Sequence, residues 1–320
     1  MPEFSHPCHN SNGYLVSCYM NTPAESFLEY RNLLFSIAYN MLGQVETAED
    51  IVQDAFLSWN QTDTVAVRHP KAFLVKIVTN KCINYLHSSR VNREKCIGVW
   101  LPEPLHETAT ENAGDRIETY HALSIGLMVV LEKLTPRERA IFLLKEIFAY
   151  DYYELAELFE ITADNARHIL RRAKDHLGQD AVRHRVDVKA HEKMLHNFLQ
   201  AVTEGNIDDL IGLLKEDIVL MAEGSGRSVD VNGQRLTATA RPIHGRQNVG
   251  RLISSVMGKF FRYLPGLRSD IIIVNGLPSI LSSVDGELFG LVSIESDGHL
   301  ISNIYIQTNP DKLRHFNPNK

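Results

Sequence analysis

The chain has 320 residues, a formal net charge of −6, 44% hydrophobic residues and 22% charged residues. This length and composition are ordinary for two or three globular domains. The negative charge argues against a protein that coats nucleic acid by itself, but it allows a DNA reader that a larger partner delivers. The sequence contains neither an apolar run of the roughly 18 residues that a membrane span needs nor a secretory signal. We therefore expect a cytoplasmic protein without membrane contact.

The beginning of the chain and its cysteines carry little functional signal. Residues 1–22 are rich in Ser, Asn, Cys and His without periodicity, and we expect them to be loose. Cys8, Cys18, Cys82 and Cys96 show no paired CxxC spacing and form no set of four metal ligands. The expectation is reduced thiols, no metal and no cofactor.

Residues 23–90 have helical periodicity and predict an all-α domain. Its first helix ends at Gly43, its second begins after Thr47 as N-cap, and its third begins near Pro70. The second helix carries an acidic and aromatic surface that suits docking to another protein, although a plain solvated face is equally common. The candidate docking residues are Asp50, Gln53, Asp54, Phe56 and Trp59.

The third helix and the residues before it are basic and rich in amides. That combination suits single-stranded DNA, where backbone charge and unstacked bases are the targets. The candidate residues are Arg68, Lys71, Lys76, Asn80, Lys81 and Asn84.

A linker and a second helical domain follow. Residues 91–116 contain Pro102 and Pro104, which interrupt helical structure and favour extended backbone. Helices resume over residues 117–133, and Thr135–Pro136 with Glu138 predicts a capping box. Within residues 117–180, a short helix over 152–159, a turn, and a helix capped by Thr162 over 163–177 predict a helix-turn-helix.

The last of these helices carries side chains that read duplex DNA. Arginine bonds guanine, asparagine bonds adenine, and lysine or arginine neutralises phosphate. The candidate residues are Asn165, Arg167, His168, Arg171, Arg172 and Lys174. A solvated helix with a run of charges is the alternative, but the turn and the capped helix before it favour DNA binding.

Residues 190–320 predict an α+β domain, with helices first and a curled antiparallel sheet after them. Expected strands cover residues 218–221, 236–240, 271–274, 280–284, 287–294 and 301–307. Asn275–Gly276 marks a turn, and Asp285–Gly286 and Asp297–Gly298 predict hairpins.

Several motifs make the chain resemble a known family. Tyr39–Gly43 and Ala48–Phe56 resemble the first domain of extracytoplasmic-function (ECF) RNA polymerase sigma factors, whose helix docks on the β′ clamp of core polymerase. Arg68–Leu74 with Ile77, Asn80, Lys81 and Asn84 resembles the segment that melts and reads the minus-ten promoter element. Residues 134–177 resemble the second domain, which reads the minus-thirty-five element. The implied partners are core RNA polymerase, through its β′ clamp and β flap, and promoter DNA.

The remainder resembles sigma factors with a fused SnoaL-like domain, a cone related to ketosteroid isomerase. The resemblance rests on the linker motif Trp100–Pro104, on the end motif Asn309–Leu313 and on a third motif, Glu223–Arg227. The third motif is altered, because Glu replaces the family's Asp and Ser replaces a Gly. The interdomain residues that it implies are Trp100, Leu101, Pro102, Glu103, Pro104, Glu223, Arg227, Asn309, Pro310, Asp311, Lys312 and Leu313.

The resemblance implies a transcription initiation factor that is regulated by its own C-terminal domain. We expect this domain to contact the linker and to set the spacing of the two DNA-reading domains, with or without a small ligand in the cone. A ligand-sensing helix-turn-helix regulator and a pocket enzyme are the alternatives. Glu223, Asp230, His244 and Asp270 are candidate acid–base residues for an enzyme, but no spacing selects a catalytic pair among them.

Overall fold

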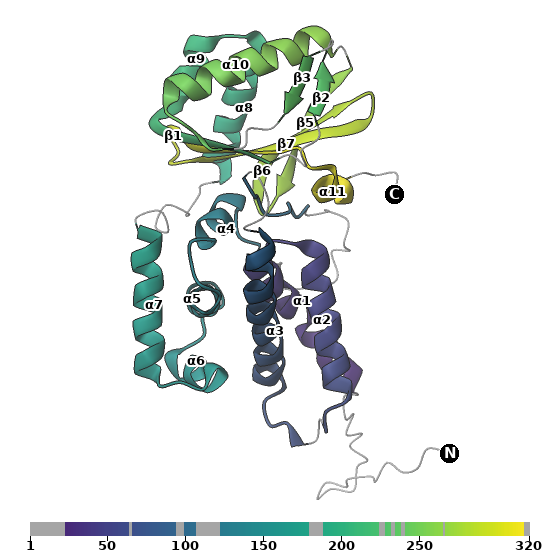
Figure 1. Cartoon of the computed structure of the whole chain (residues 1–320), viewed down its shortest axis with the longest axis vertical. Coiled ribbons are helices and arrows are strands. Elements are labelled where there is room, and N and C mark those ends of the chain that lie inside the picture. The colour runs from purple at the N-terminus through teal and green to yellow at the C-terminus, as the bar shows by residue number, and fades with distance from the viewer. Residues whose placement is uncertain are drawn as a thin grey trace, which may run out of the picture.

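A helical half comes first in the chain, and a half built on a curved sheet follows and rests on it (Figure 1). The computed structural model describes residues 23–63, 66–93, 99–106, 122–178, 188–223, 228–231, 234–237, 241–264 and 266–316. The architecture confirms the predicted order of two all-α parts followed by an α+β part. Within the described ranges, no helix is long and apolar enough to cross a membrane.

The first helical part consists of α1 (Pro23–Leu42), α2 (Val45–Asn60) and α3 (Pro70–Arg93). Helix α1 ends at Gly43 as predicted, because this residue has a φ of +66° that favours glycine. The prediction of Thr47 as an N-cap was wrong, since α2 already begins at Val45. The N–H of Val45 is satisfied from outside the helix, at 2.8 Å from the carboxylate of Glu103.

The second helical part consists of α4 (Ile125–Leu131), α5 (Pro136–Phe142) with a π-helical continuation (Leu143–Ile147), α6 (Tyr152–Phe159) and α7 (Ala163–Leu177). The predicted capping box of Thr135 and Glu138 and the predicted N-cap Thr162 are confirmed. The helix expected from residue 117 begins instead at Ile125, where Ser124 accepts the N–H of Leu127 at 3.2 Å. Residues 107–121 lie outside the described chain.

One hydrophobic core joins the two helical parts. Buried side chains from α1, α2 and α3 are continuous with those of α4 to α7. Polar contacts reinforce this junction: Arg139 on α5 donates to the carbonyl of Met41 at 2.8 Å, and Asn40 on α1 accepts the N–H of Leu123 at 3.0 Å. The two parts are therefore packed against each other and are not merely tethered.

The C-terminal half combines helices with a six-stranded sheet in the order β4-β1-β8-β7-β6-β5. Its helices are α8 (Val188–Glu204), α9 (Ile207–Leu213), α10 (Arg246–Tyr263) and the short α11 (Pro310–Leu313). Its strands are β1 (Leu214–Glu223), β4 (Ile243–His244), β5 (Leu267–Val274), β6 (Leu277–Val284), β7 (Glu287–Ser296) and β8 (Ile301–Gln307). A separate hairpin holds β2 (Ser228–Val231) and β3 (Gln234–Thr237).

The turns at Asn275–Gly276, Asp285–Gly286 and Asp297–Gly298 connect neighbouring antiparallel strands, which confirms both predicted hairpins. The pairing of β1 with β8 is parallel and was not predicted. Helix α10 was also missed by the sequence reading. The strand expected over 236–240 occupies Gln234–Thr237 instead, and residues 238–240 are not described.

The sheet has two faces with different neighbours. Its inner face packs against α8 and α10 through side chains such as Phe198, Val249, Ile218 and Ile304. Its outer face is turned towards the helical half, with α4 directly beneath it (Figure 1). Contacts between the two halves therefore arise on the outer face, opposite the core of the cone.

Candidate interdomain site and DNA-reading surfaces

Residues 99–106 of the linker lie between α1–α2 and the C-terminal half. Glu103 is 5% exposed and contacts both neighbours. Its N–H donates to the carbonyl of Gly43 at 2.8 Å, and its own carbonyl accepts the hydroxyl of Tyr39 at 2.7 Å. The Oε1 of its carboxylate lies 2.9 Å from Nε2 of His315, while Oε2 caps α2 at Val45. The linker is thus bonded on both sides through one residue.

A buried ion pair of the C-terminal half contacts the linker at Trp100 and Leu101. Glu223, at the end of β1, accepts the N–H of Leu101. The ammonium of Lys312 lies 2.7 Å from Oε1 of Glu223 and also donates to the carbonyl of Leu101. The same ammonium sits 4.7 Å from the centre of the Trp100 ring, a cation–π arrangement. The expected contact between the linker motif and the end motif is therefore present in the structure.

The other residues of these motifs shape the same region. Asn309 caps α11 by accepting the N–H of Asp311 at 3.1 Å, and Leu313 is buried beside Val274 and Leu291. Pro310 occupies the first turn of α11. The remaining linker prolines, Pro102 and Pro104, are buried. The side chain of Asp311 is exposed, so Lys312, and not Asp311, makes the contact with the linker. Arg227 lies outside the described residues.

Asn275 at the β5–β6 turn joins three segments and was not predicted as a site residue. Its side-chain NH₂ donates to the hydroxyl of Tyr39 at 2.8 Å and to the carbonyl of Leu123 at 2.8 Å. Its Oδ1 accepts the N–H of Leu105 at 2.9 Å. One side chain that is 2% exposed therefore connects α1, the linker and the segment before α4. Burial raises the pKa of Tyr39, so this hydroxyl stays protonated and donates to Glu103.

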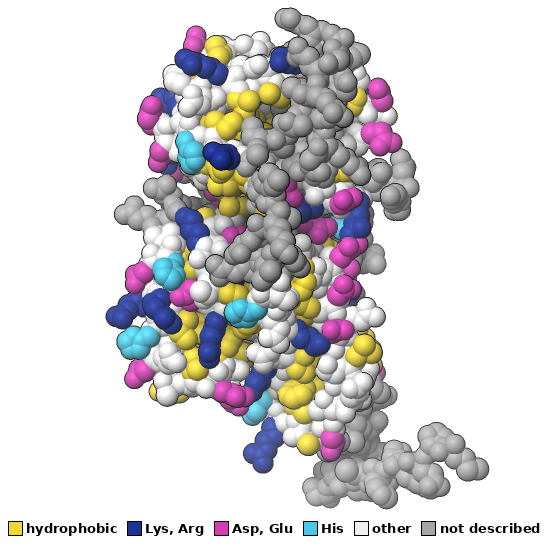
Figure 2. Space-filling model, viewed as in Figure 1, with side chains coloured by type: hydrophobic (Ala, Val, Ile, Leu, Met, Phe, Trp, Pro, Cys, Tyr) yellow, Lys and Arg dark blue, Asp and Glu magenta, His cyan; other side chains and the backbone are white. Residues whose placement is uncertain are grey.

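The outer surface of α7 is strongly basic. All the candidate residues of this helix are exposed: Asn165, Arg167, His168, Arg171, Arg172 and Lys174. Arg167 is oriented by an ion pair with Asp164 at 2.6 Å and lies 4.9 Å from the ring centre of Tyr152. Figure 2 shows Lys, Arg and His side chains gathered over this lower-left part of the molecule. The inward positions Ala166, Ile169 and Leu170 hold the helix in the core.

The candidate residues of α3 and the loop before it are exposed or half-buried. Arg68, Lys71, Asn80 and Asn84 are exposed. Lys81 pairs with Asp54 of α2 at 3.0 Å. Lys76 forms a 2.6 Å ion pair with Glu160, in the turn of the helix-turn-helix. The candidate surface on α3 thus contacts the turn that precedes α7.

The acidic surface of α2 differs from its prediction at one residue. Asp50, Gln53 and Asp54 are exposed, as a docking surface requires. Trp59 is only 1% exposed and packs against Phe73 with ring centres 5.8 Å apart, so its assignment to the surface was wrong. Phe56 is half-buried against Phe27 with ring centres 5.0 Å apart. The aromatic residues of α2 serve the core, and its acidic and amide residues face outward.

Comparisons with known proteins identify both helical parts. Residues 27–91 match the family Sigma-70 region 2, and residues 125–177 match Sigma-70, region 4. The ECF RNA polymerase sigma factor SigJ of Mycobacterium tuberculosis is 33% identical over 256 residues, covering 78% of each chain. The chain belongs to the ECF RNA polymerase sigma factors. It directs RNA polymerase to promoters, as members of this family do.

The similarity extends to the C-terminal half of this sigma factor. The crystal structure of M. tuberculosis SigJ has a TM-score of 0.70 and 26% identity, and the match covers 93% of this chain and 100% of that one. The probable ECF sigma factor SigI of M. tuberculosis is 23% identical and matches 89% of this chain and 92% of its own. The SigJ structure therefore shares the arrangement of helical domains followed by a sheet domain.

Gly43 of this sigma factor is a sensitive point, because it meets the linker. A Cβ atom there would lie 2.7 Å from Cη2 of Trp100, and the φ of +66° disfavours any other residue. We expect Gly43→Ala to lower the free energy of unfolding by about 2–4 kcal/mol, of which about 1–2 kcal/mol is backbone strain. Chemical denaturation, followed together with tryptophan fluorescence, measures this loss and the displacement of Trp100.

Gly205 provides the matched control. Its φ is +70°, but a Cβ atom there would meet nothing within 4 Å. Gly205→Ala should therefore lower the free energy of unfolding by the backbone strain alone, and the fluorescence of Trp100 should be unchanged. Equal losses for both variants would show that the approach of Trp100 to Gly43 contributes nothing to stability.

Proposed function

We propose that this sigma factor reads the minus-ten element with α3 and the loop before it, and the minus-thirty-five element with α7. The support for this division is chemical. The loop and α3 present cations and amides that suit a single strand, and α7 presents arginine and asparagine at helical spacing that suits a major groove. Asp50, Gln53 and Asp54 are proposed to dock on the β′ clamp, and the second helical part on the β flap. This assigns the protein to the cytoplasm, where the polymerase works.

We further propose that the described arrangement is a closed state that cannot bind a whole promoter. The two elements are centred about 25 base pairs apart, which is roughly 85 Å along B-form DNA. In the structure, Lys76 of the minus-ten surface lies 2.6 Å from Glu160 in the turn before α7, and both helical parts share one core. This closeness is the observation that carries the proposal, because the two surfaces must separate before they reach both elements.

The C-terminal half is proposed to hold this state closed. Asn275 bonds Tyr39 in the first helical part and Leu123 next to the second. Glu223 and Lys312 grip the linker at Leu101. The ion pair between Lys76 and Glu160 is exposed and contributes only about 0–1 kcal/mol, so it does not provide the restraint by itself. The restraint comes from the buried contacts of the C-terminal half and from the shared core.

In vitro transcription with core polymerase tests the DNA-reading assignment. We expect Arg171→Ala to reduce start-site-specific transcript about tenfold on a promoter with both elements, since one base or phosphate contact contributes about 1–3 kcal/mol. Lys193→Ala is the control, because Lys193 is a similarly exposed cation on α8. A binding measurement between the sigma factor and core polymerase should be unchanged for both variants. An undiminished amount of transcript with Arg171→Ala would show that Arg171 does not contact the promoter.

A further inference from the structure

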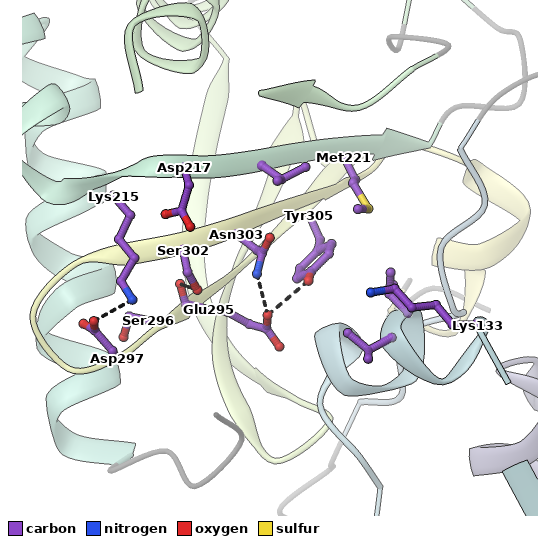
Figure 3. Close-up of a pocket in the computed structure, with 13 residues that line it drawn as sticks. Lys133, Lys215, Asp217, Met221, Glu295, Ser296, Asp297, Ser302, Asn303 and Tyr305 are labelled. Atoms are coloured by element: carbon purple, nitrogen blue, oxygen red, sulfur yellow. Dashed lines mark hydrogen bonds and ion pairs between the residues drawn. The ribbon is translucent and has the colours of Figure 1, made fainter. Parts of the chain in front are cut away.

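A cavity of about 260 Å³ lies between the second helical part and the outer face of the sheet (Figure 3). Its helical wall consists of Val129, Val130 and Lys133, on α4 and just after it. Its sheet wall consists of residues on β1, β7 and β8 and at the β7–β8 turn: Lys215, Asp217, Val219, Met221, Glu295, Ser296, Asp297, Ser302, Asn303 and Tyr305. The cavity is thus shared between a DNA-reading domain and the C-terminal half.

This cavity is distinct from the interior of the cone. Val219 and Met221 line it, whereas Ile218 and Leu220 on the same strand point into the core with α8 and α10. Alternate residues of a strand face opposite sides of its sheet. A molecule in this cavity therefore lies on the opposite face of the sheet from the position expected for a ligand inside the cone.

The chemistry of the cavity is apolar on one side and hydrogen-bonding on the other. Val129, Val219 and Met221 supply the apolar surface. Glu295 supplies a carboxylate whose Oε2 accepts hydrogen bonds from Asn303 at 3.0 Å and from the hydroxyl of Tyr305 at 3.1 Å, while its Oε1 is buried beside Gly126. In Figure 3 the side chains of Asn303 and Tyr305 converge on this carboxylate. A carboxylate offers about four acceptor positions, so a positioned one can also receive a donor from a bound molecule.

The charges around the cavity favour a donor over an anion. Lys215 lies 2.7 Å from Asp297, and this hydrogen bond lowers the pKa of the Asp297 carboxyl. The two charges of this pair offset each other. Asp217 and Glu295 then outnumber Lys133, whose side chain is exposed at the edge. A bound carboxylate or phosphate would meet two acidic groups, and an ammonium would be attracted by both.

We propose that this interdomain cavity binds a small amphipathic molecule with a hydrogen-bond-donor head, preferably a primary ammonium. The head lies at Glu295, and the apolar body lies against Val129, Val219 and Met221. Because its walls belong to different domains, the bound molecule has a different affinity for the closed and the separated arrangement, and so it shifts their populations. Only this last consequence rests on the proposed closed state.

Methyl NMR of the full chain labelled at the methionine Cε tests the binding without transcription. Met221 lines the cavity, and Met194 lies in the core of the cone, so the two methyl signals separate the two positions. The Met221→Leu variant assigns the first signal. The probes are n-hexylammonium and hexanoate, which match in length and differ in charge, each titrated through the millimolar range. We expect n-hexylammonium to shift the Met221 signal saturably and hexanoate to bind at least tenfold more weakly.

Two variants connect the signal to the cavity. Val219→Phe fills the cavity from its sheet wall and should abolish the shift, and Glu295→Gln should remove most of the preference for the ammonium. Circular dichroism tests whether each variant is folded. If Glu295→Gln is not folded, Val219→Phe and the hexanoate titration still test the proposal. A saturable shift of Met194 without Met221, equal binding of hexanoate, or no saturable shift at all would overturn the proposal.

Discussion

Replacing Asn275 with alanine is expected to separate the two DNA-reading domains and to destabilise the closed arrangement by about 3–5 kcal/mol. The variant removes the partner of the buried carbonyl of Leu123 and of the half-buried N–H of Leu105. The variant also places alanine at a φ of +51°, a left-handed conformation that asparagine adopts more readily than alanine does. Spin labels at Leu57 and Asp175, exposed positions on α2 and α7, should report a longer and broader distance distribution.

Asn275→Gly separates the two causes, because glycine accepts the positive φ but supplies no hydrogen bonds. We expect it to open the protein nearly as much as alanine does. In transcription assays both variants should give more transcript than the parent at limiting core polymerase, since less free energy is needed for separation. Unchanged distances in both variants would show that Asn275 does not restrain the domains.

Loss of the ion pair between Glu223 and Lys312 is expected to release the linker from the C-terminal half. Their side chains are 10% and 12% exposed, so removal of either partner leaves a buried charge uncompensated. Glu223→Gln or Lys312→Met should each lower the free energy of unfolding by about 3–5 kcal/mol. The double variant should lose less than the sum of the single losses, with a coupling of about 1–3 kcal/mol. Chemical denaturation of all four proteins measures this cycle.

Asp311→Ala is the matched control for this pair, because its side chain is exposed one residue before Lys312. It should change stability by less than about 0.5 kcal/mol. Fluorescence gives a second measurement, since the ammonium of Lys312 lies over Trp100 and the chain's other tryptophan, Trp59, is buried. Additive single losses, with an unaltered Trp100 spectrum, would contradict the idea that this pair holds the linker.

Local signals in the sequence predicted most of the helices, although not α10, and the turns at Asn275–Gly276, Asp285–Gly286 and Asp297–Gly298. Thr135, Glu138 and Thr162 cap helices through hydrogen bonds within a few residues, so their pattern is visible without tertiary information. Trp59 was misplaced although a signal existed. Val52, Ala55 and Trp59 follow the spacing of one apolar helix face, and this periodicity outweighs the preference of tryptophan for docking surfaces.

Contacts between domains were less accessible to sequence reasoning. Only the family resemblance indicated that the segments around Trp100 and Lys312 meet. Asn275 was visible as part of an Asn-Gly turn, but the partners of its side chain depend on how the halves dock. The same holds for the cap on α2, where the acceptor on Glu103 lies 58 residues from Val45. No local propensity encodes such pairs.

The order of these contacts along the chain has a consequence during synthesis. Strand β1 pairs with β8, and Lys312 and His315 follow β8, so the groups that fix the linker emerge from the ribosome after both sigma domains. Translation proceeds at roughly 5–20 residues per second, and pairing between strands distant in sequence is slow to form. Each new molecule therefore passes through a period of several seconds in which both sigma domains are complete and the contacts that the C-terminal half makes with the linker do not yet exist.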